Sequence, residues 1–162
     1  NTSSFWNFAI RAATCEVACM KLLVVSDTHG RYGRVRGYLE DYPSVTHIMH
    51  LGDGVRDMED LSREYPDKYF MCVRGNNDFG CNYPEHYQFC LLGHTFFAAH
   101  GHTLGVRTSV FRLLEAARAA GADIALFGHT HMKYDNTVDG IRVLNPSSYG
   151  AYLISENKIE FI

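Results

Sequence analysis

Five apolar stretches of the sequence each lead directly into a polar cluster that carries aspartate, asparagine or histidine beside a glycine. Continuous apolar runs of this kind are typical of strands buried on both faces of a sheet. In open α/β sheets, binding sites form where strands end, so we expect the clusters to meet at one edge. The five expected strands span 21–26, 47–51, 69–74, 95–99 and 124–127. The clusters that follow them are, in the same order, Asp27/His29, Asp53, Asn76, His100/His102 and His129/His131.

The rest of the chain alternates strands with helices at first and ends in hairpins. Helices are expected over 33–41, 55–64 and 108–120, where apolar residues recur at helical spacing or acidic residues form a short polar helix. Further strands are expected over 86–92, 134–138, 141–144, 151–155 and 158–162. This order predicts an α/β sandwich with mixed sheets.

The size and charge of the chain limit its partners. Its 162 residues match one ordinary domain, and 46% hydrophobic with 20% charged residues are typical of a globular protein. A net charge of -3 provides no basic surface for a stable nucleic-acid partner, although a small nucleotide stays open as a substrate because metal ions could meet its phosphate. No apolar run reaches the length of a membrane span, so we expect no membrane association.

Cysteine usage and the first residues favour a cytoplasmic protein with an N-terminal extension. The cysteines form no CxxC pair and their number is odd, which favours reduced thiols. The apolar part of residues 1–19 is interrupted by Asn7 and Arg11 and makes a poor signal peptide. Met20 and Lys21 then run straight into the first expected strand. We therefore predict a non-catalytic extension over 1–19 and a catalytic domain over 20–162.

The side chains in the clusters indicate divalent metal ions. Aspartate, histidine and an asparagine carbonyl, without cysteine, suit ions such as Mn, Fe, Ni or Zn. Seven or eight donors exceed the need of one tetrahedral ion, whereas two ions that share a carboxylate fit the number better. Two ions about 3.5–4 Å apart can hold both the attacking and the leaving oxygen of a displacement at phosphorus. Each cluster alone is a weak signal, because a Gly-Asp or Gly-Asn pair is usually only a turn, so the prediction rests on the whole set.

The ordered motifs Asp-Thr-His, Gly-Asp, Gly-Asn-Asn-Asp, His-Gly-His and Gly-His-Thr-His resemble those of the calcineurin-like metallophosphoesterase superfamily over residues 20–162. Their short spacing is similar to that of its small bacterial and archaeal phosphodiesterase branch. The resemblance implies an αββα fold, with two mixed β-sheets sandwiched between helices. It also implies hydrolysis of phosphodiester bonds, in a small diester or a nucleotide, through a two-metal site and a metal-bridging hydroxide. Manganese is the metal expected first, with Ni, Fe, Zn and Mg as alternatives. A homo-oligomer is left open as a possible assembly.

The resemblance assigns a role to each matched residue. One metal ion would be held by Asp27, His29 and His131, and Asp53 would bridge both ions. The second ion would be held by Asn76, His100 and His129. The residues expected to take part in catalysis are Asn76, which would also lie near the phosphate, His100, and His102, which would contact the substrate or support a ligand.

Two positions depart from the family pattern. Many members carry a histidine that acts as general acid directly after Gly-Asn, where this chain has Asn77. Asp78, His102 or a metal-bound water could supply the proton instead. The turn over 145–148 (Asn-Pro-Ser-Ser) leads almost directly into a strand, whereas related chains often have a longer loop here. Substrate contacts from this loop are therefore left open.

The other histidines have no place in this ligand set. His50 precedes Leu-Gly-Asp and is expected to pack or hydrogen-bond beneath the site. His47, His86 and His94 are expected to be surface or hairpin residues.

Two alternative functions stay open. One branch of the superfamily, a retromer subunit, is a non-catalytic protein-interaction scaffold, and the stretch 82–85 (Asn-Tyr-Pro-Glu) resembles that branch. Scaffold members tend to lose the asparagine at position 76, which this chain keeps. A simple phosphomonoesterase is the other alternative.

Overall fold

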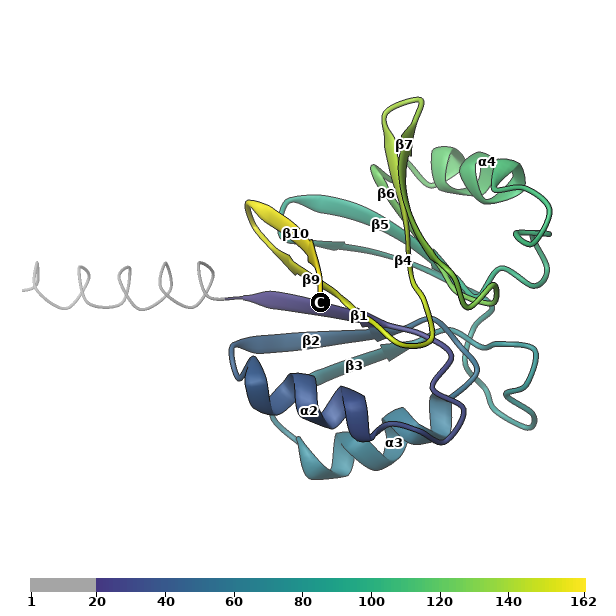
Figure 1. Cartoon of the computed structure of the whole chain (residues 1–162). Helices are drawn as coiled ribbons and strands as arrows, with labels where there is room; N and C mark the ends of the chain where they lie inside the picture. Colours follow the sequence, from purple (N-terminus) through teal and green to yellow (C-terminus); the bar gives the residue numbers. More distant parts are fainter. Residues whose placement is uncertain (1–19) are drawn as a thin grey trace, which may run out of the picture.

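The computed structural model describes residues 20–162, in which two β-sheets pack face to face between helices (Figure 1). The elements, in chain order, are β1 (Lys21–Val25), α2 (Gly33–Asp41), β2 (Val45–His50), α3 (Val55–Glu64), β3 (Tyr69–Cys72), β4 (His86–Leu91), β5 (His94–Ala99), α4 (Phe111–Ala119), β6 (Ile124–Phe127), β7 (Lys133–Val138), β8 (Ile141–Pro146), β9 (Tyr152–Ser155) and β10 (Lys158–Phe161). One sheet has the strand order β10-β9-β1-β2-β3 and the other β4-β5-β6-β8-β7. Each sheet combines parallel and antiparallel pairs, so the predicted α/β sandwich with two mixed sheets is confirmed.

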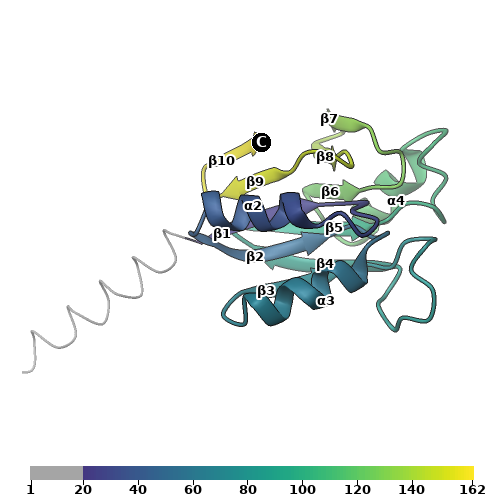
Figure 2. The same ribbon diagram turned by 60° about the horizontal axis from the view of Figure 1, so that its bottom comes forward.

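β1 is buried on both faces because its residues alternate between two apolar layers. Leu22 and Val24 lie in the core between the two sheets, together with residues of β5 and β6. Leu23 and Val25 pack instead with α2 and α3, which cover the outer face of the first sheet (Figure 2). α4 covers the outer face of the second sheet in the same way. This double burial explains why the sequence of β1 is a continuous apolar run.

Parallel pairing brings the ends of the strands that precede the polar clusters to one edge. β1 runs parallel to β2 and β2 to β3, while β5 runs parallel to β6 in the second sheet. The turns after β1 and β2 are joined by hydrogen bonds from N of Asp27 to O of Gly52 and from N of His29 to O of Asp53, both 3.0 Å long. The clusters therefore sit on turns that are fixed to one another by backbone hydrogen bonds.

Several elements differ by one to three residues from their expected bounds, and in three of them the hydrogen bonds show why. β3 ends at Cys72 rather than 74, where its pairing with β2 stops. α4 begins at Phe111 rather than 108, because N of Ser109 bonds to O of Gly105 in a turn and Ser109 Oγ accepts the N–H of Phe111. β8 extends to Pro146 rather than 144, because its last two residues pair with β7.

Within residues 20–162, no helix is long and apolar enough to cross a membrane. Cys72, Cys81 and Cys90 are free thiols. The predicted extension over 1–19 lies outside the described residues, so its separation from the domain stays a prediction.

Candidate metal centre

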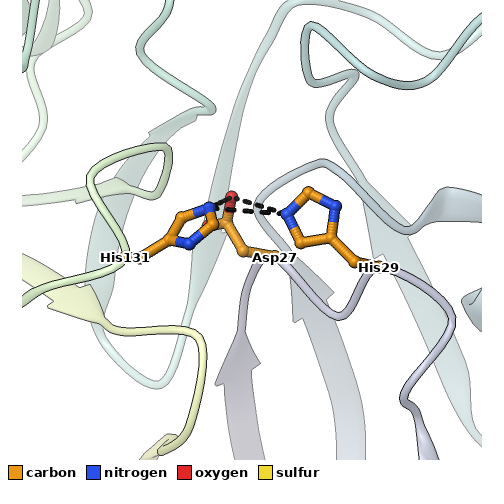
Figure 3. Close-up of side chains that lie close together, drawn as sticks. All are labelled: Asp27, His29 and His131. Atoms are coloured by element: carbon orange, nitrogen blue, oxygen red, sulfur yellow. Dashed lines mark hydrogen bonds and ion pairs between the residues drawn. The ribbon is translucent and has the colours of Figure 1, made fainter.

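The end of β1 and the loop after β6 bring Asp27, His29 and His131 together. Asp27 Oδ1 lies 3.2 Å from Nε2 of His131 and 3.9 Å from Nε2 of His29. The two histidine Nε2 atoms are 3.4 Å apart, and Figure 3 shows both rings beside the aspartate oxygen. Three donor atoms at this spacing could hold one divalent ion.

A second group of donors forms around His100, which directly follows β5. Its Nε2 lies 3.4 Å from Asp53 Oδ2, 4.0 Å from Asp27 Oδ1 and 3.0 Å from Asn76 Oδ1. Its Nδ1 lies 2.7 Å from O of Leu51. A ring nitrogen that donates to a backbone carbonyl leaves the other nitrogen as the metal-binding one, so Nε2 is the donor that faces the cluster.

Asp27 and Asp53 both lie between the two groups. Asp27 belongs to each of them, and Asp53 Oδ2 lies 3.8 Å from Nε2 of His29 and 3.4 Å from Nε2 of His100. The family resemblance assigns the bridging role to Asp53 alone, whereas these distances give Asp27 equal access to both groups. Two carboxylates between two sets of nitrogen donors could hold a pair of ions.

His129 and His102 complete the cluster on the side of His100. The ring centroid of His129 is 5.0 Å from that of His100 and 6.2 Å from that of His102. Burial lowers the pKa of His129 to about 4 and also lowers the pKa of His102. An imidazole with a lowered pKa is neutral near pH 7, and the neutral ring is the form that binds a metal ion. All eight predicted side chains are thus gathered at one rim.

The carboxylate of Asp27 is the strongest sign that the cluster suits a cation. Its Oδ1 is buried and has no hydrogen-bond partner within residues 20–162. Its Oδ2 accepts hydrogen bonds from Oγ of Ser26 and, at 3.1 Å, from N of His129. Burial raises the pKa of Asp27, because a buried carboxylate needs a partner for its charge. A divalent ion held jointly with His29 and His131 would be such a partner.

Five of the expected ligand positions adopt a left-handed backbone conformation. Such φ angles are uncommon outside glycine and persist only where the surrounding structure holds them. They occur at Asp27 (54°), His29 (45°), Asp53 (61°), His129 (66°) and His131 (60°). Strain of this kind clusters at functional sites, so its position here agrees with the predicted centre.

Asp78 holds the turn that carries Asp53. Its Oδ2 accepts the N–H groups of Asp53 and Gly75, each at 2.7 Å, and its Oδ1 accepts those of Gly54 at 2.9 Å and Val55 at 3.2 Å. Both oxygens are therefore occupied by the backbone. These contacts show that Asp78 supports the turn, and they argue against its use as the substitute general acid, which stays a prediction.

Asn77 supports the same aspartate from its other side. Its backbone N–H donates to Asp53 Oδ1 at 2.8 Å and its Nδ2 to Asp53 Oδ2 at 2.9 Å. Burial alone would raise the pKa of Asp53, but the neighbouring His100 ring and the hydrogen bonds from Asn77 outweigh it and lower that pKa. The residue found where the family pattern has a general acid thus positions a carboxylate.

A buried network beneath the cluster confirms the expectation for His50. Gly52 N–H donates to Nδ1 of His50 at 3.1 Å, so the ring proton is assigned to Nε2, which lies 3.0 Å from Oγ1 of Thr28. Thr28 in turn donates to Asp57 Oδ2 at 2.6 Å, and the same oxygen accepts the N–H of Gly30 at 2.8 Å. Sequence reasoning missed Asp57, whose only signal is an acidic side chain in the first turn of the helix after Gly-Asp-Gly.

Asn145 is a second residue that sequence reasoning missed. Its Nδ2 donates to O of Gly128 and to Oγ1 of Thr130, both at 3.0 Å, and its Oδ1 accepts the N–H of Ser147 at 2.9 Å. It therefore ties the loop between β8 and β9 to the loop that carries His129 and His131. The Asn-Pro-Ser-Ser turn marked this position without showing its partners.

Residues 20–160 match the family model described as the calcineurin-like phosphoesterase superfamily domain. A phosphodiesterase from Methanocaldococcus jannaschii is 28% identical over 151 residues, which cover 83% of this chain and 87% of that protein. The crystal structure of a predicted phosphoesterase from Streptococcus pneumoniae superposes with a TM-score of 0.72 at 26% identity, covering 88% of each chain. Vps29 from Entamoeba histolytica in complex with zinc superposes with a TM-score of 0.71 at 18% identity over 88% of this chain and 98% of that one, a likeness that shows the fold alone.

The substitution Asp78→Asn tests the structural role of Asp78. An amide nitrogen would face backbone N–H groups, so we expect the free energy of unfolding to fall by at least about 2 kcal/mol in urea denaturation. Metal affinity should fall with it, because Asp53 loses its support. Asp60→Asn is the matched control, since that carboxylate pairs only with exposed Arg63 and should matter little. A variant with normal stability and metal affinity but slow turnover would restore Asp78 as a candidate acid.

His50 predicts a pH dependence of stability in the chelated protein. Burial lowers its pKa to about 4 in the folded state, against about 6.5 in an unfolded chain. Between these values the unfolded chain binds more protons, so acidification favours unfolding by up to ~1.4 kcal/mol per pH unit. His50→Gln should remove this part of the slope. Parallel stability curves for the two proteins between pH 6.5 and 4.5 would contradict the assignment.

Proposed function

Because the chain belongs to the calcineurin-like phosphoesterase superfamily, we propose that it hydrolyses phosphodiester bonds with two divalent ions held at this rim. Water supplies the oxygen that bonds to phosphorus, one ester P–O bond breaks, and the departing oxygen takes up a proton. A diester thereby yields a monoester and an alcohol. Manganese is the metal proposed first, because it suits mixed carboxylate, imidazole and amide donors. The free thiols Cys72, Cys81 and Cys90 favour a cytoplasmic location.

The observation that carries this proposal is the Oδ1 atom of Asp27, which has no hydrogen-bond partner within residues 20–162 and which both donor groups share. A buried carboxylate oxygen without a hydrogen bond is costly, and two cations would offset that cost. When bound, a pair of divalent ions lowers the pKa of a coordinated water and stabilises the charge that develops at phosphorus. His29 and His131 would hold one ion; Asn76, His100 and His129 would hold the other.

Two side chains of the rim would orient the substrate. Asn76 presents its Oδ1 to His100 at 3.0 Å, which leaves its Nδ2 amide free to donate to a phosphate oxygen. His102 has a buried Nδ1 without a hydrogen-bond partner in the described part of the chain. Its lowered pKa keeps the ring neutral, so it can donate one hydrogen bond and accept another beside His129. Both residues thus offer polar groups next to the donors.

Two hollows beside the cluster favour a diester over a monoester. One, of about 570 Å³, is lined by Asp27, His29 and His131 among others, and a second, of about 290 Å³, is lined by His29, Asp53 and Asn77. A diester carries an organic group on each of two ester oxygens, and each hollow offers space for one of them. A monoester would occupy only one hollow.

The alternatives are a non-catalytic scaffold of the same fold and a phosphomonoesterase. In sequence, the resemblance to the scaffold branch rests on a short stretch over 82–85, which contributes no side chain to the candidate metal centre. Asn76, which scaffold members tend to lose, faces His100 in this structure. The arrangement therefore favours the enzyme, and matched substrates separate the two kinds of esterase.

We expect the manganese-loaded protein to cleave bis(p-nitrophenyl) phosphate with a higher kcat/KM than p-nitrophenyl phosphate. It should bind close to two equivalents of metal in elemental analysis. The rates are measured with Mn, Ni, Mg and Zn in turn. Faster cleavage of the monoester would identify a phosphomonoesterase, and a plateau at one equivalent with full activity would exclude the two-ion mechanism. A folded protein that cleaves neither ester with any metal would be a scaffold.

The substitution Asp53→Asn should be among the most damaging single changes. It removes a charge that lies within 4 Å of both His29 and His100, so the loss in kcat/KM should exceed the roughly 10–100-fold cost of changing a residue behind a ligand. His94→Ala is the control, because His94 pairs with Asp123 at 2.6 Å outside the cluster. Equal losses from the two substitutions would show that the ligand set is misassigned.

A further inference from the structure

The larger hollow joins the candidate metal centre to a basic wall. Its lining includes Asp27, His29 and His131 and also Arg31, Arg34 and Tyr149. Its volume of about 570 Å³ lies within the range of small-molecule sites. A substrate whose phosphorus sits at the metal ligands can therefore extend one ester arm along this wall.

The charge of this wall is positive. Asp27 is the only carboxylate among the lining residues, and it is buried and directed to the metal ligands. Arg31 and Arg34 are exposed and form no ion pair with any residue in 20–162. Five other arginines of that range do pair with aspartate or glutamate. The guanidinium groups of Arg31 and Arg34 are therefore available to bind an anion.

Arg34 is held in place by the loop between β8 and β9. Its Nη1 donates to O of Tyr149, and its guanidinium lies over the Tyr149 ring, 5.5 Å from the centroid. Ser147 Oγ fixes that loop by accepting the N–H groups of Tyr149 and Gly150, each at 3.2 Å. A guanidinium has five N–H donors, so these contacts leave several available. The short loop that differs from the family pattern therefore forms part of the hollow.

We propose that this hollow binds a second phosphate of the substrate, so that the preferred substrates are diesters with an additional phosphate on one arm. The inference rests on the proposed phosphodiesterase function. Arg31 and Arg34 would bind the second phosphate, while the diester phosphate lies at the metal ligands. Guanidinium groups suit this task because their planar donors match phosphate oxygens and stay charged at every working pH.

The test compares two substrates that differ only in the second phosphate: the p-nitrophenyl ester of thymidine 5′-phosphate, with and without a 3′-phosphate. We expect the 3′-phosphate to lower KM roughly tenfold or more, with kcat little changed, because charge-assisted hydrogen bonds form in the ground state. The difference should shrink as salt is raised. Arg31→Ala and Arg34→Ala should each bring the two KM values together, with Arg31→Lys retaining part of the difference. Arg63→Ala should retain all of it, because Arg63 lies in the last turn of α3, pairs with Asp60 and does not line the hollow.

A binding measurement separates this inference from the proposed function. Isothermal titration with thymidine 3′,5′-bisphosphate and with thymidine 5′-phosphate should show tighter binding of the bisphosphate, and Arg31→Ala should abolish the difference. Equal KM values and equal affinities for the two compounds would overturn the inference while leaving the phosphodiesterase function intact. Arginine variants that weaken the binding of both compounds equally would also overturn the inference. If neither ester is cleaved but the bisphosphate still binds more tightly, the proposed function fails and the phosphate site stands.

Discussion

His100 joins the two sheets and both halves of the candidate metal centre. The residue is fully buried, directly follows β5, and lies with Nδ1 2.7 Å from the carbonyl of Leu51, just beyond β2. Its own carbonyl accepts the N–H of Gly128, just beyond β6, at 3.1 Å. His100 thus connects the ends of three strands, β2 of the first sheet and β5 and β6 of the second. A slip between the sheets would separate the donors as well as the apolar layers, so the packing of the core and the geometry of the centre are coupled.

The turns at this edge are held by side chains that bind backbone rather than one another. Asp78 accepts four N–H groups around Asp53, and Asn145 bridges the two loops of the second sheet. Glycine allows the closest approaches: a Cβ at Gly128 would lie 2.7 Å from Oδ2 of Asp27. Ordering of the ligand positions is therefore completed during folding, which lowers the cost of ordering when a ligand binds.

The sequence allowed the strands and the grouping of the candidate ligands at one edge to be predicted, because both depend on local patterns. An apolar run such as that of β1 indicates a strand that is buried on both faces. Parallel strands bring their carboxyl ends to the same edge of a sheet, so the side chains that follow them are expected to lie close together. The roles of Asp57, Asp78 and Asn145 could not be predicted, because aspartate and asparagine are common in turns and their partners lie far away in the chain. The prediction that the helix over 108–120 begins at 108 was wrong for a similar reason. Ser109 Oγ accepts the backbone N–H of Phe111, and helical spacing alone cannot reveal this contact.

The left-handed backbone at five candidate ligand positions has a consequence for redesign. Outside glycine, asparagine, aspartate and histidine are the residues that tolerate this conformation best, whereas β-branched and bulky residues do not. The backbone of the rim therefore accepts the same few side chains that suit borderline and hard ions. Exchanges among these three residue types could alter metal selectivity without rebuilding the loops. A change to a different ligand chemistry, such as a set of thiolates, would require new turns first.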